Sequence, residues 1–267
     1  MNQYKLNPDK AIKLKDVDPD DTGDIKHKAD VQEQLAKDLL RLRVLQEALY
    51  AEHKRSLLIV LQAMDTGGKD GTIEHVCGAM NPQGVVVTPF KVPSAEEMAH
   101  DYLWRVHKVA PGKGMIGVFN RSHYEDVLVV RVHDLVPKEV WSQRYAQINQ
   151  FEKLLADNGT VILKFFLHIS KVEQKARLLD RLNTPDKRWK FALGDLKERA
   201  LWDQYQDAYE DALNKCTTAA APWYVVPANK KWYRNYVVAR IVRQTLEEMN
   251  PQYPQPTEDL SQVVIED

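Results

Sequence analysis

A glycine-rich turn directly after a strongly apolar stretch constrains this chain more than any other feature. Six of the seven residues from 57 to 63 (L-L-I-V-L-Q-A) are apolar, which predicts a strand buried on both faces. Gly67, Gly68 and Lys69 follow, and a helix is expected from Asp70 to about Met80. Glycines let backbone N–H groups approach phosphate oxygens, a helix N-terminus favours anions, and lysine adds a full positive charge. The stretch therefore predicts a phosphate-binding P-loop.

The loop departs from the common spacing G-x-x-x-x-G-K-[ST]. Ala63 replaces the first glycine, Asp70 replaces the Ser or Thr, and the hydroxyl moves to Thr72. Asp65 adds a second carboxylate. Two carboxylates repel a polyanion unless a cation lies between them, so we expect Mg²⁺ held partly by Asp65, Asp70 or both. The alternatives are that Asp65 only forms the turn and that Asp70 only caps the helix.

Composition narrows the class of protein. The 267 residues are 44% hydrophobic and 28% charged with a net charge of −1, which suits one globular domain and gives no global sign of nucleic-acid or membrane binding. Cys77 and Cys216 lack metal-like spacing, so we expect reduced, buried thiols. We see no apolar leader and no apolar run near ~18 residues, which predicts a cytoplasmic protein.

Predicted strands and helices alternate along the chain. Strands are expected at 57–63, 85–90, 115–119, 160–169 and 222–227. Helices are expected at 30–53, 70–80, 94–109, 137–157, 195–215 and 231–249. This alternation predicts an α/β fold with a parallel sheet flanked by helices on both faces. We expect one domain over 1–267, with an N-terminal arm at 1–29 and a C-terminal tail at 250–267.

The stretch from Asn120 to Asp126 ends a predicted strand, where ligands of parallel sheets bind. P-loop proteins usually carry a metal-binding Asp at this point. Here it is Asn120, so the metal carboxylate is expected at Glu125 or Asp126. Arg121 is placed to clamp phosphate with its planar fork. The alternatives are a structural ion pair for Arg121 and pairing of one acid with Arg131.

Residues 171–199 hold nine basic side chains against five acidic ones, a local balance of +4. A turn at 183–186 separates two arms, and Arg177 and Arg181 share one helix face. We interpret residues 170–199 as a lid that closes over a polyanion. The alternative is an ordinary solvated charged face.

Three aromatic rings lie near these motifs. Trp189 and Trp104 have basic neighbours and are expected to pack rather than to stack on adenine. His123 is expected to be a hydrogen-bonded structural residue rather than a phosphohistidine or an acid–base group.

Taken together, these motifs resemble the polyphosphate kinase 2 family across essentially the whole chain. The matching stretches are M-D-T-G-G-K-D-G-T at 64–72, F-N-R-S-H-Y-E-D at 119–126, D-Y-L-W-R at 101–105, R-L-N-T-P-D-K-R-W-K at 181–190 and P-A-N-K-K-W-Y-R-N at 227–235. The resemblance implies a three-layer P-loop kinase fold, thymidylate-kinase-like, with a helical lid. It also implies phosphoryl transfer between inorganic polyphosphate and a nucleotide with Mg²⁺, for which Mn²⁺ is expected to substitute.

The resemblance assigns catalytic roles to Asp65, Lys69, Arg121 and Arg181. Glu125 and Asp126 are expected to position the acceptor and, with Asp65, to hold the metal. Asn120 combined with Glu125 is similar to the subgroup that accepts both AMP and ADP. Phosphate binding is expected of the loop and of basic side chains around it: Gly67, Gly68, Lys69, Asp70, Gly71, Thr72, Arg121, Arg177, Arg181, Arg188 and Lys190.

The expected reaction transfers the terminal phosphoryl group of polyphosphate to AMP and ADP, giving ADP and ATP reversibly. Family resemblance also implies a homo-oligomer, a tetramer. The runner-up functions are an ATP-dependent nucleoside monophosphate kinase and a non-catalytic regulator that binds polyphosphate or nucleotide. Asp70 and the missing first glycine argue against the former. Carboxylates in the loop argue against the latter, since they are unfavourable for mere anion binding.

Overall fold

Within residues 1–260 and 263–265, which this computed structural model describes, the centre of the fold is one five-stranded sheet. Its order is β2-β3-β1-β4-β5, and every neighbouring pair is parallel. The strands are β1 (Ser56–Gln62), β2 (Val85–Pro89), β3 (Ile116–Asn120), β4 (Thr160–His168) and β5 (Trp223–Pro227). The predicted parallel sheet is confirmed. Each crossover between neighbouring parallel strands runs through helix, as the connection of parallel strands requires.

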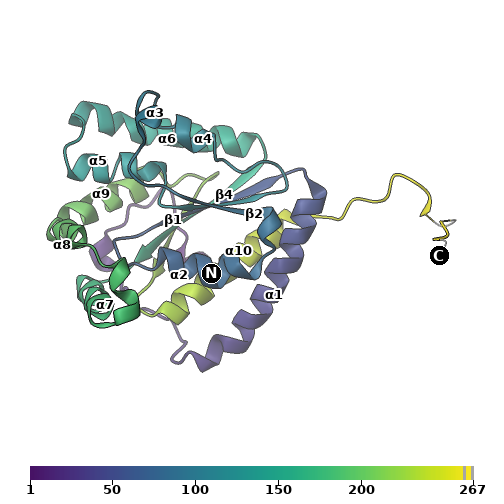
Figure 1. Ribbon diagram of the computed structural model, residues 1–267, viewed down its shortest axis with the longest axis horizontal. Coiled ribbons are helices and arrows are strands. Elements are labelled where there is room, and N and C mark those ends of the chain that lie inside the picture. Colours follow the sequence, from purple (N-terminus) through teal and green to yellow (C-terminus); the bar gives the residue numbers. More distant parts are fainter. Residues whose placement is uncertain (261–262, 266–267) are drawn as a thin grey trace.

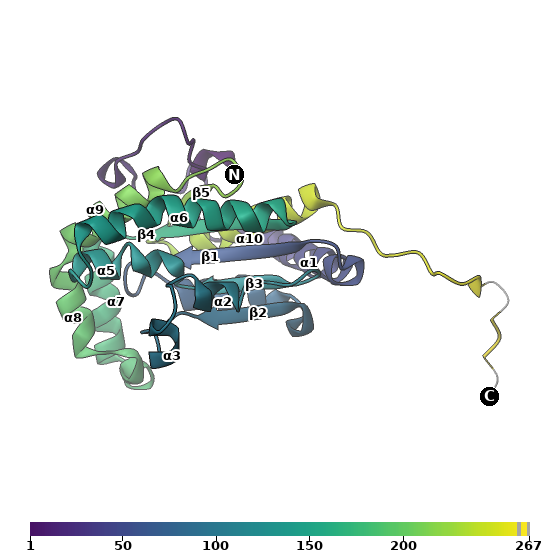
Figure 2. The same ribbon diagram turned by 90° about the horizontal axis from the view of Figure 1, so that it is seen from above.

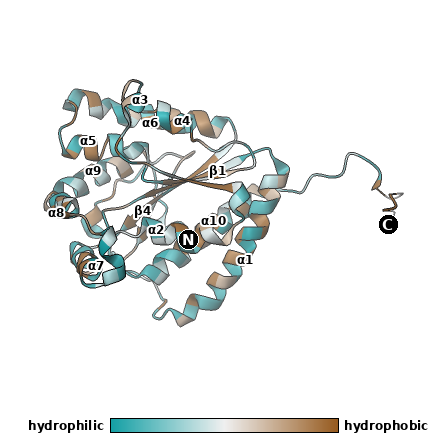
Figure 3. Cartoon of the chain, viewed as in Figure 1, coloured by the Kyte–Doolittle hydropathy of each residue, from teal (hydrophilic) through white to brown (hydrophobic). Residues whose placement is uncertain are grey.

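Helices cover both faces of the sheet and give the fold three layers (Figure 1). One face carries α5 (Val129–Val132), α6 (Lys138–Asp157) and α9 (Trp202–Lys215). The other carries α1 (Ala29–Glu52), α2 (Lys69–Val76) and α10 (Lys231–Met249). Hydropathy follows this layering, since the strands are hydrophobic and the outer helix faces are largely polar (Figure 3).

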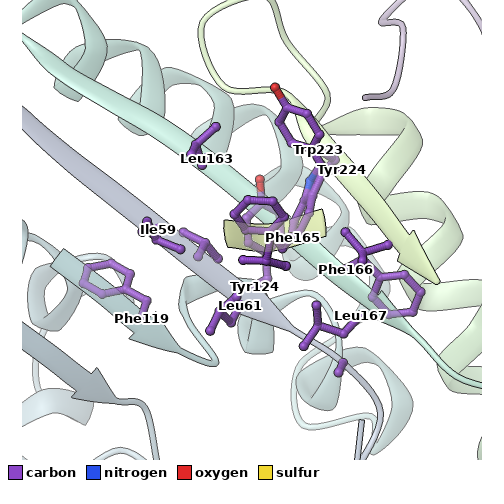
Figure 4. Close-up of a cluster of buried hydrophobic side chains, with 14 of the residues drawn as sticks. Ile59, Leu61, Phe119, Tyr124, Leu163, Phe165, Phe166, Leu167, Trp223 and Tyr224 are labelled. Atoms are coloured by element: carbon purple, nitrogen blue, oxygen red, sulfur yellow. The ribbon is translucent and has the colours of Figure 1, made fainter. Parts of the chain in front are cut away.

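The central strands form the core because neighbouring strands and helices shield both of their faces. All seven residues of β1 are buried, as the apolar run predicts. Aromatic side chains of β4 and β5 belong to this core: Phe166 packs against Tyr209 of α9, Trp223 against Tyr124, and Phe165 against Tyr224 (Figure 4). One charge lies among them. Lys164 of β4 donates to Glu152 Oε2 at 2.5 Å and to the Tyr124 hydroxyl at 2.8 Å.

Two predicted helices are each broken in the structure. The segment 94–109 forms α3 (Ala95–Met98), with the expected capping box at Ser94, and α4 (Trp104–His107). Between them the Asp101 carboxylate accepts from the Leu103 N–H, which turns the chain. The segment 195–215 forms α8 (Leu193–Ala200) and α9, with the break at Leu201. The short helix α5 has too few residues to show a helical period, and sequence reasoning missed it.

The predicted lid is helical and stands at the carboxyl edge of the sheet. It consists of α7 (Lys171–Asn183), a 3₁₀ helix (Pro185–Lys190) and α8, and it begins just after β4 (Figure 2). Arg199 of α8 donates to the Lys171 carbonyl at 2.7 Å and to the Gln174 side chain at 2.9 Å, so the two lid helices contact each other.

The arm and the tail differ in how they meet the body. The arm is docked, because Tyr4 and Leu14 are buried and Lys5 pairs with Tyr224 of β5. The described part of the tail leads away from the body after Pro251 (Figure 1). Among the described residues, none of the helices has the length and apolarity needed to cross a membrane.

Both cysteines match their prediction. Cys77 and Cys216 are buried and unpaired, and burial raises the pKa of each thiol to about 12.

Candidate active site

Many charged side chains line a cavity of about 940 Å³ at the carboxyl edge of the sheet. Its wall comes from the predicted P-loop, from the ends of β2 and β3, from the lid and from the first turn of α10. The lining residues used below are Asp65, Gly67, Gly68, Lys69, Asp70, Gly71, Asn120, Arg121, Arg177, Arg181, Lys187, Trp189, Lys190, Asp195, Lys231, Arg234 and Asn235.

The P-loop needs its two glycines for different reasons. A side chain on Gly67 would lie 2.4 Å from the Ala63 Cβ and 2.8 Å from the Met64 carbonyl, so the turn is too tight for one. Gly68 has φ +102°, which L-residues disfavour. Thr66, directly before Gly67, also has a positive φ, of 63°. Backbone strain of this kind clusters at functional sites.

Lys69 begins α2 and folds back beneath the loop. Its Nζ donates to the Ala63 carbonyl at 3.1 Å, and the side chain is buried. Burial lowers the pKa of Lys69 to about 8, with a further contribution from the nearby Arg121 charge. A phosphate group bound in the loop would restore the stability of the charged form, since an anion beside an ammonium raises its pKa.

Asp65, Arg121 and Glu125 form one charged cluster. Arg121 donates to Asp65 Oδ1 at 2.8 Å and lies 3.6 Å from Glu125 Oε2. Burial opposes the charge of Arg121, but Glu125 and Asp65 outweigh it and raise the guanidinium pKa. Burial raises the pKa of Glu125, while Arg121 and Lys69 act against that rise. Arg121 is thus both ion-paired and part of the pocket wall.

Asp70 does not cap α2, because no side chain caps this helix. Its Oδ1 instead accepts from the Asn120 amide at 2.7 Å. An aspartate at position 120 would place two carboxylates in contact there, whereas the amide supplies a donor. The departure at Asn120 therefore has a local partner that the sequence spacing did not reveal.

The two arginines of α7 differ in how firmly their side chains are held. Arg177 lines the pocket, but its N–H groups go to the Thr66, Ala228 and Asn229 carbonyls and to Glu173. It therefore holds the P-loop and the chain after β5 in place. Arg181 is less constrained. Its Nη1 donates to the Lys190 carbonyl at 3.2 Å and to Asp195 Oδ2 at 3.5 Å.

The packing prediction for Trp189 is wrong. Its side chain is 78% exposed at the pocket, with Lys190 Nζ 5.0 Å from the ring centre. Trp104 does pack as predicted, stacked on His100 at 4.1 Å between ring centres. His123 is also structural as predicted, fully buried with Glu152 Oε1 3.1 Å from its Nε2.

Four predicted site residues lie outside the pocket wall: Glu125 of the charged cluster above, Thr72, Arg188 and Asp126. The Thr72 hydroxyl is buried and donates to the Gly68 carbonyl at 3.0 Å. Arg188 is exposed and donates to the Leu182 carbonyl. The Asp126 carboxylate turns to Arg144, 3.1 Å away, and burial raises its pKa to about 6. The structure therefore does not bring Asp126 together with Asp65.

The chain after β5 contributes residues that we did not predict. Lys231, Arg234 and Asn235 of α10 line the pocket beside the P-loop. They belong to the stretch 227–235, which carried part of the family resemblance. The rule that ligands bind after the carboxyl ends of strands applies to β5 as well as to β3, and it would have found them.

The family of this chain follows from comparison with known proteins. A family model described as Polyphosphate kinase 2 matches residues 25–254. The chain belongs to the polyphosphate kinase 2 family. It is 56% identical, over the full length of both chains, to the AMP/ADP-polyphosphate phosphotransferase of Meiothermus ruber.

Other members of the polyphosphate kinase 2 family agree with this. The chain is 47% identical to the ADP-polyphosphate phosphotransferase of Rhodopseudomonas palustris, over 81% of this chain and 79% of the relative. The crystal structure of polyphosphate kinase 2 from Arthrobacter aurescens TC1 matches with a TM-score of 0.94 at 47% identity, covering 97% of this chain and 93% of the other. The predicted family and P-loop kinase fold are confirmed.

Proposed function

We propose that the protein transfers the terminal phosphoryl group of inorganic polyphosphate to AMP and ADP, giving ADP and ATP reversibly. The observation that carries this is Lys69, a buried cation beneath a glycine loop, beside the Asp65–Arg121 pair in one pocket. A relative named AMP/ADP-polyphosphate phosphotransferase, identical at 56% of positions, supports the choice of substrates.

In the proposed reaction, a phosphate oxygen of the nucleotide attacks the terminal phosphorus of polyphosphate in line. The bridging P–O bond breaks, and its electron pair stays on the oxygen of the shortened chain. Loop N–H groups, Lys69, Arg121 and Arg181 hold the phosphates and stabilise the charge that spreads over their oxygens. The second pKa of a phosphate monoester is about 6. The acceptor is then mostly deprotonated at neutral pH and needs no strong general base.

The carboxylates of the pocket suit a magnesium ion. Asp65 and Asp70 both line the pocket. In the described part of the chain, no group of three or more metal-ligating side chains occurs. Mg²⁺ is usually held by one or two carboxylates together with substrate phosphates and water, which fits such a sparse set. When bound, the ion neutralises phosphate oxygens during transfer. We propose that Mn²⁺ substitutes for it.

We assign Glu125 to the positioning of the acceptor. It lies against Arg121 and in the field of Lys69, so it orients the cations rather than abstracting a proton. We keep Asp126 out of this role, since Arg144 holds its carboxylate away from the cluster.

We propose that the lid excludes water while the phosphoryl group moves, because water would otherwise hydrolyse the polyphosphate chain. Gln174 and Arg177 of α7 bond to the Asp65 and Thr66 carbonyls at 3.1 and 2.9 Å. The base of the lid is thus joined to the P-loop, and closure involves the part beyond Arg177.

We also propose that the protein is a homotetramer. Apolar side chains are exposed on α1 (Leu40 and Val44) and on the edge strand β2 (Val86 and Val87), which supports self-association. Light scattering coupled to gel filtration measures the mass directly. A monomer at working concentrations would reject the tetramer and leave the reaction unaffected.

The reaction is tested by incubating the purified protein with Mg²⁺, polyphosphate and AMP, and by following nucleotides by chromatography. We expect ADP first and ATP later. ADP alone would restrict the enzyme to the first transfer.

The same assay separates the alternatives. No product from polyphosphate, together with ADP formed from ATP plus AMP, would identify a nucleoside monophosphate kinase. Binding of polyphosphate with no turnover of any donor would identify a regulator.

A further inference from the structure

Arg234 lies in the first turn of α10 and presses against the P-loop. Its side chain is buried, with 2% exposed. A side chain built on Gly68 would lie only 1.7 Å from Arg234 Nη1, and one on Gly71 would lie 3.2 Å from Nη2. The guanidinium therefore fills the space that the loop glycines leave open. It also lines the pocket.

Within the described part of the chain, the charge of Arg234 has no acidic partner. Five lysines and arginines of the described residues are buried: Lys69, Arg105, Lys164, Arg177 and Arg234. Three of them have a carboxylate within 4 Å, at Glu97, Glu152 and Glu173 respectively. The two without one are Lys69 and Arg234, and both lie against the P-loop.

The surroundings of Arg234 leave its charge uncompensated. Nε and Nη2 donate to the neutral Asn235 Oδ1, and among the described residues Nη1 has no hydrogen-bond partner. Burial, with an added contribution from the nearby Arg177 charge, lowers the guanidinium pKa to about 10. A buried, unpaired cation is destabilising unless a ligand neutralises it, so this arrangement anticipates an anion.

The sheet order separates this cation from the acidic cluster. β3 and β5 lie on opposite sides of β1, so Arg121 approaches the loop from one side and Lys231 and Arg234 from the other. Asp65 and Glu125 already compensate Arg121. The more cationic side is the better place for a chain that carries a negative charge at each phosphate.

We propose that Arg234, supported by Lys231, binds the polyphosphate donor behind its terminal phosphoryl group, so that the donor lies on the α10 side and the nucleotide on the Arg121 side. This assignment rests on the proposed polyphosphate-dependent activity. Arg234 stabilises the negative charge left on the shortened chain when the P–O bond breaks. ATP has only three phosphates that could contact these cations, whereas polyphosphate has many. Arg234 and Lys231 therefore favour polyphosphate over ATP as the donor.

The test compares Arg234→Met with Arg240→Met, a control on the same helix. Arg240 is partly exposed, lies 3.7 Å from Asp38 and does not line the pocket. We expect the KM for polyphosphate to rise roughly 10- to 100-fold in Arg234→Met, the range for losing charged hydrogen bonds. The KM for AMP and ADP should change by less than about threefold. Arg234→Lys should restore part of the donor affinity, because it returns the charge without the fork.

Thermal unfolding supplies a readout that is independent of turnover. Polyphosphate alone should raise the Tm of the wild type and of Arg240→Met, but much less that of Arg234→Met. Without ligand, the Tm of Arg234→Met should not fall, since the variant removes an unpaired buried charge.

Several outcomes would overturn the assignment. Equal increases in the KM for donor and acceptor would indicate a structural role, as would an Arg234→Met variant that behaves like Arg240→Met. If Arg234→Met does not fold, Arg234→Lys decides the matter, and an unchanged KM for polyphosphate would reject the proposal. A wild type that neither uses polyphosphate nor is stabilised by it would reject the proposed function and this assignment together.

Discussion

Lys69 shows how one buried charge prepares the pocket for an anion. Its ammonium group has a carbonyl partner rather than a carboxylate, and burial lowers its pKa to about 8. Asp65, four residues earlier, is paired with Arg121. The loop thus combines a cation that is poised for phosphate with an acid that is positioned for the metal.

Replacing Lys69 by Ala should therefore abolish most of the turnover. We expect kcat to fall roughly a thousand-fold, because a charge that stabilises the transferring phosphoryl group is lost. Folding should survive, as the variant removes a desolvated charge. Lys113→Ala, at an exposed position outside the pocket, is the control. Steady-state kinetics and circular dichroism measure both effects, and near-normal turnover in Lys69→Ala would refute the assignment.

The lowered pKa of Lys69 gives a pH prediction. Above about pH 8 the free enzyme loses this positive charge, so kcat/KM for polyphosphate should decrease. Bound phosphates raise the pKa again, so kcat should persist to higher pH. The fold responds in the opposite direction. The unfolded chain holds this proton up to about pH 10, so stability should rise with pH between the two pKa values.

Lys69→Arg is the control for the pH profile, because its guanidinium stays charged over this range. Its kcat/KM should show no decrease near pH 8, even if its activity is lower overall. An unchanged profile would assign the titration to another group.

Trp189 offers an exposed aromatic face at the pocket, and purine bases stack well on such faces. Trp189→Ala should raise the KM for AMP roughly tenfold while kcat changes little. Trp104→Ala is the matched control, since Trp104 stacks on His100 outside the pocket. Kinetics at saturating polyphosphate measure the effect. Equal KM values for the two variants would show that Trp189 does not stack on the nucleotide.

Among the elements, α7 and α8 carry the prediction about closure. The base of α7 is bonded to the P-loop, whereas Arg181 and the 3₁₀ helix beyond it have weaker or exposed contacts. Hydrogen exchange of residues 185–200 should slow roughly tenfold when polyphosphate and AMP bind together. Amides of α6 provide the internal control. Equal exchange with and without substrates would argue against a lid.

For the molecule as a whole, the buried Lys164–Glu152 pair ties β4 to α6 and to the loop after β3. Both side chains are almost completely buried, and Tyr124 and His123 join the same network. Lys164→Met leaves Glu152 buried without its cation, so the free energy of unfolding should drop by about 3–5 kcal/mol.

The control for this network is Lys153→Met on the surface of α6, where the loss should stay below about 1 kcal/mol because solvent screens the pair with Asp157. Urea unfolding measures both values. If Lys164→Met matched Lys153→Met in stability, the network would not be a major source of it.

Local patterns were enough to predict much of this protein. Apolar runs located all five strands, and the glycine–lysine loop located the phosphate site, because strand burial and loop conformation depend on neighbouring residues. Breaks inside the predicted helices at Asp101 and Leu201 were missed. They depend on side-chain bonds and packing that leave little trace in a periodic pattern.

Only the tertiary structure decided which charges share a partner. Asp126 is one residue from Glu125, yet its carboxylate turns to Arg144 while Glu125 faces Arg121. Arg234 lies more than 160 positions from Gly68 in the sequence but fills the space beside it. Such contacts depend on the order of strands in the sheet, and hydrophobic periodicity carries no information about that order.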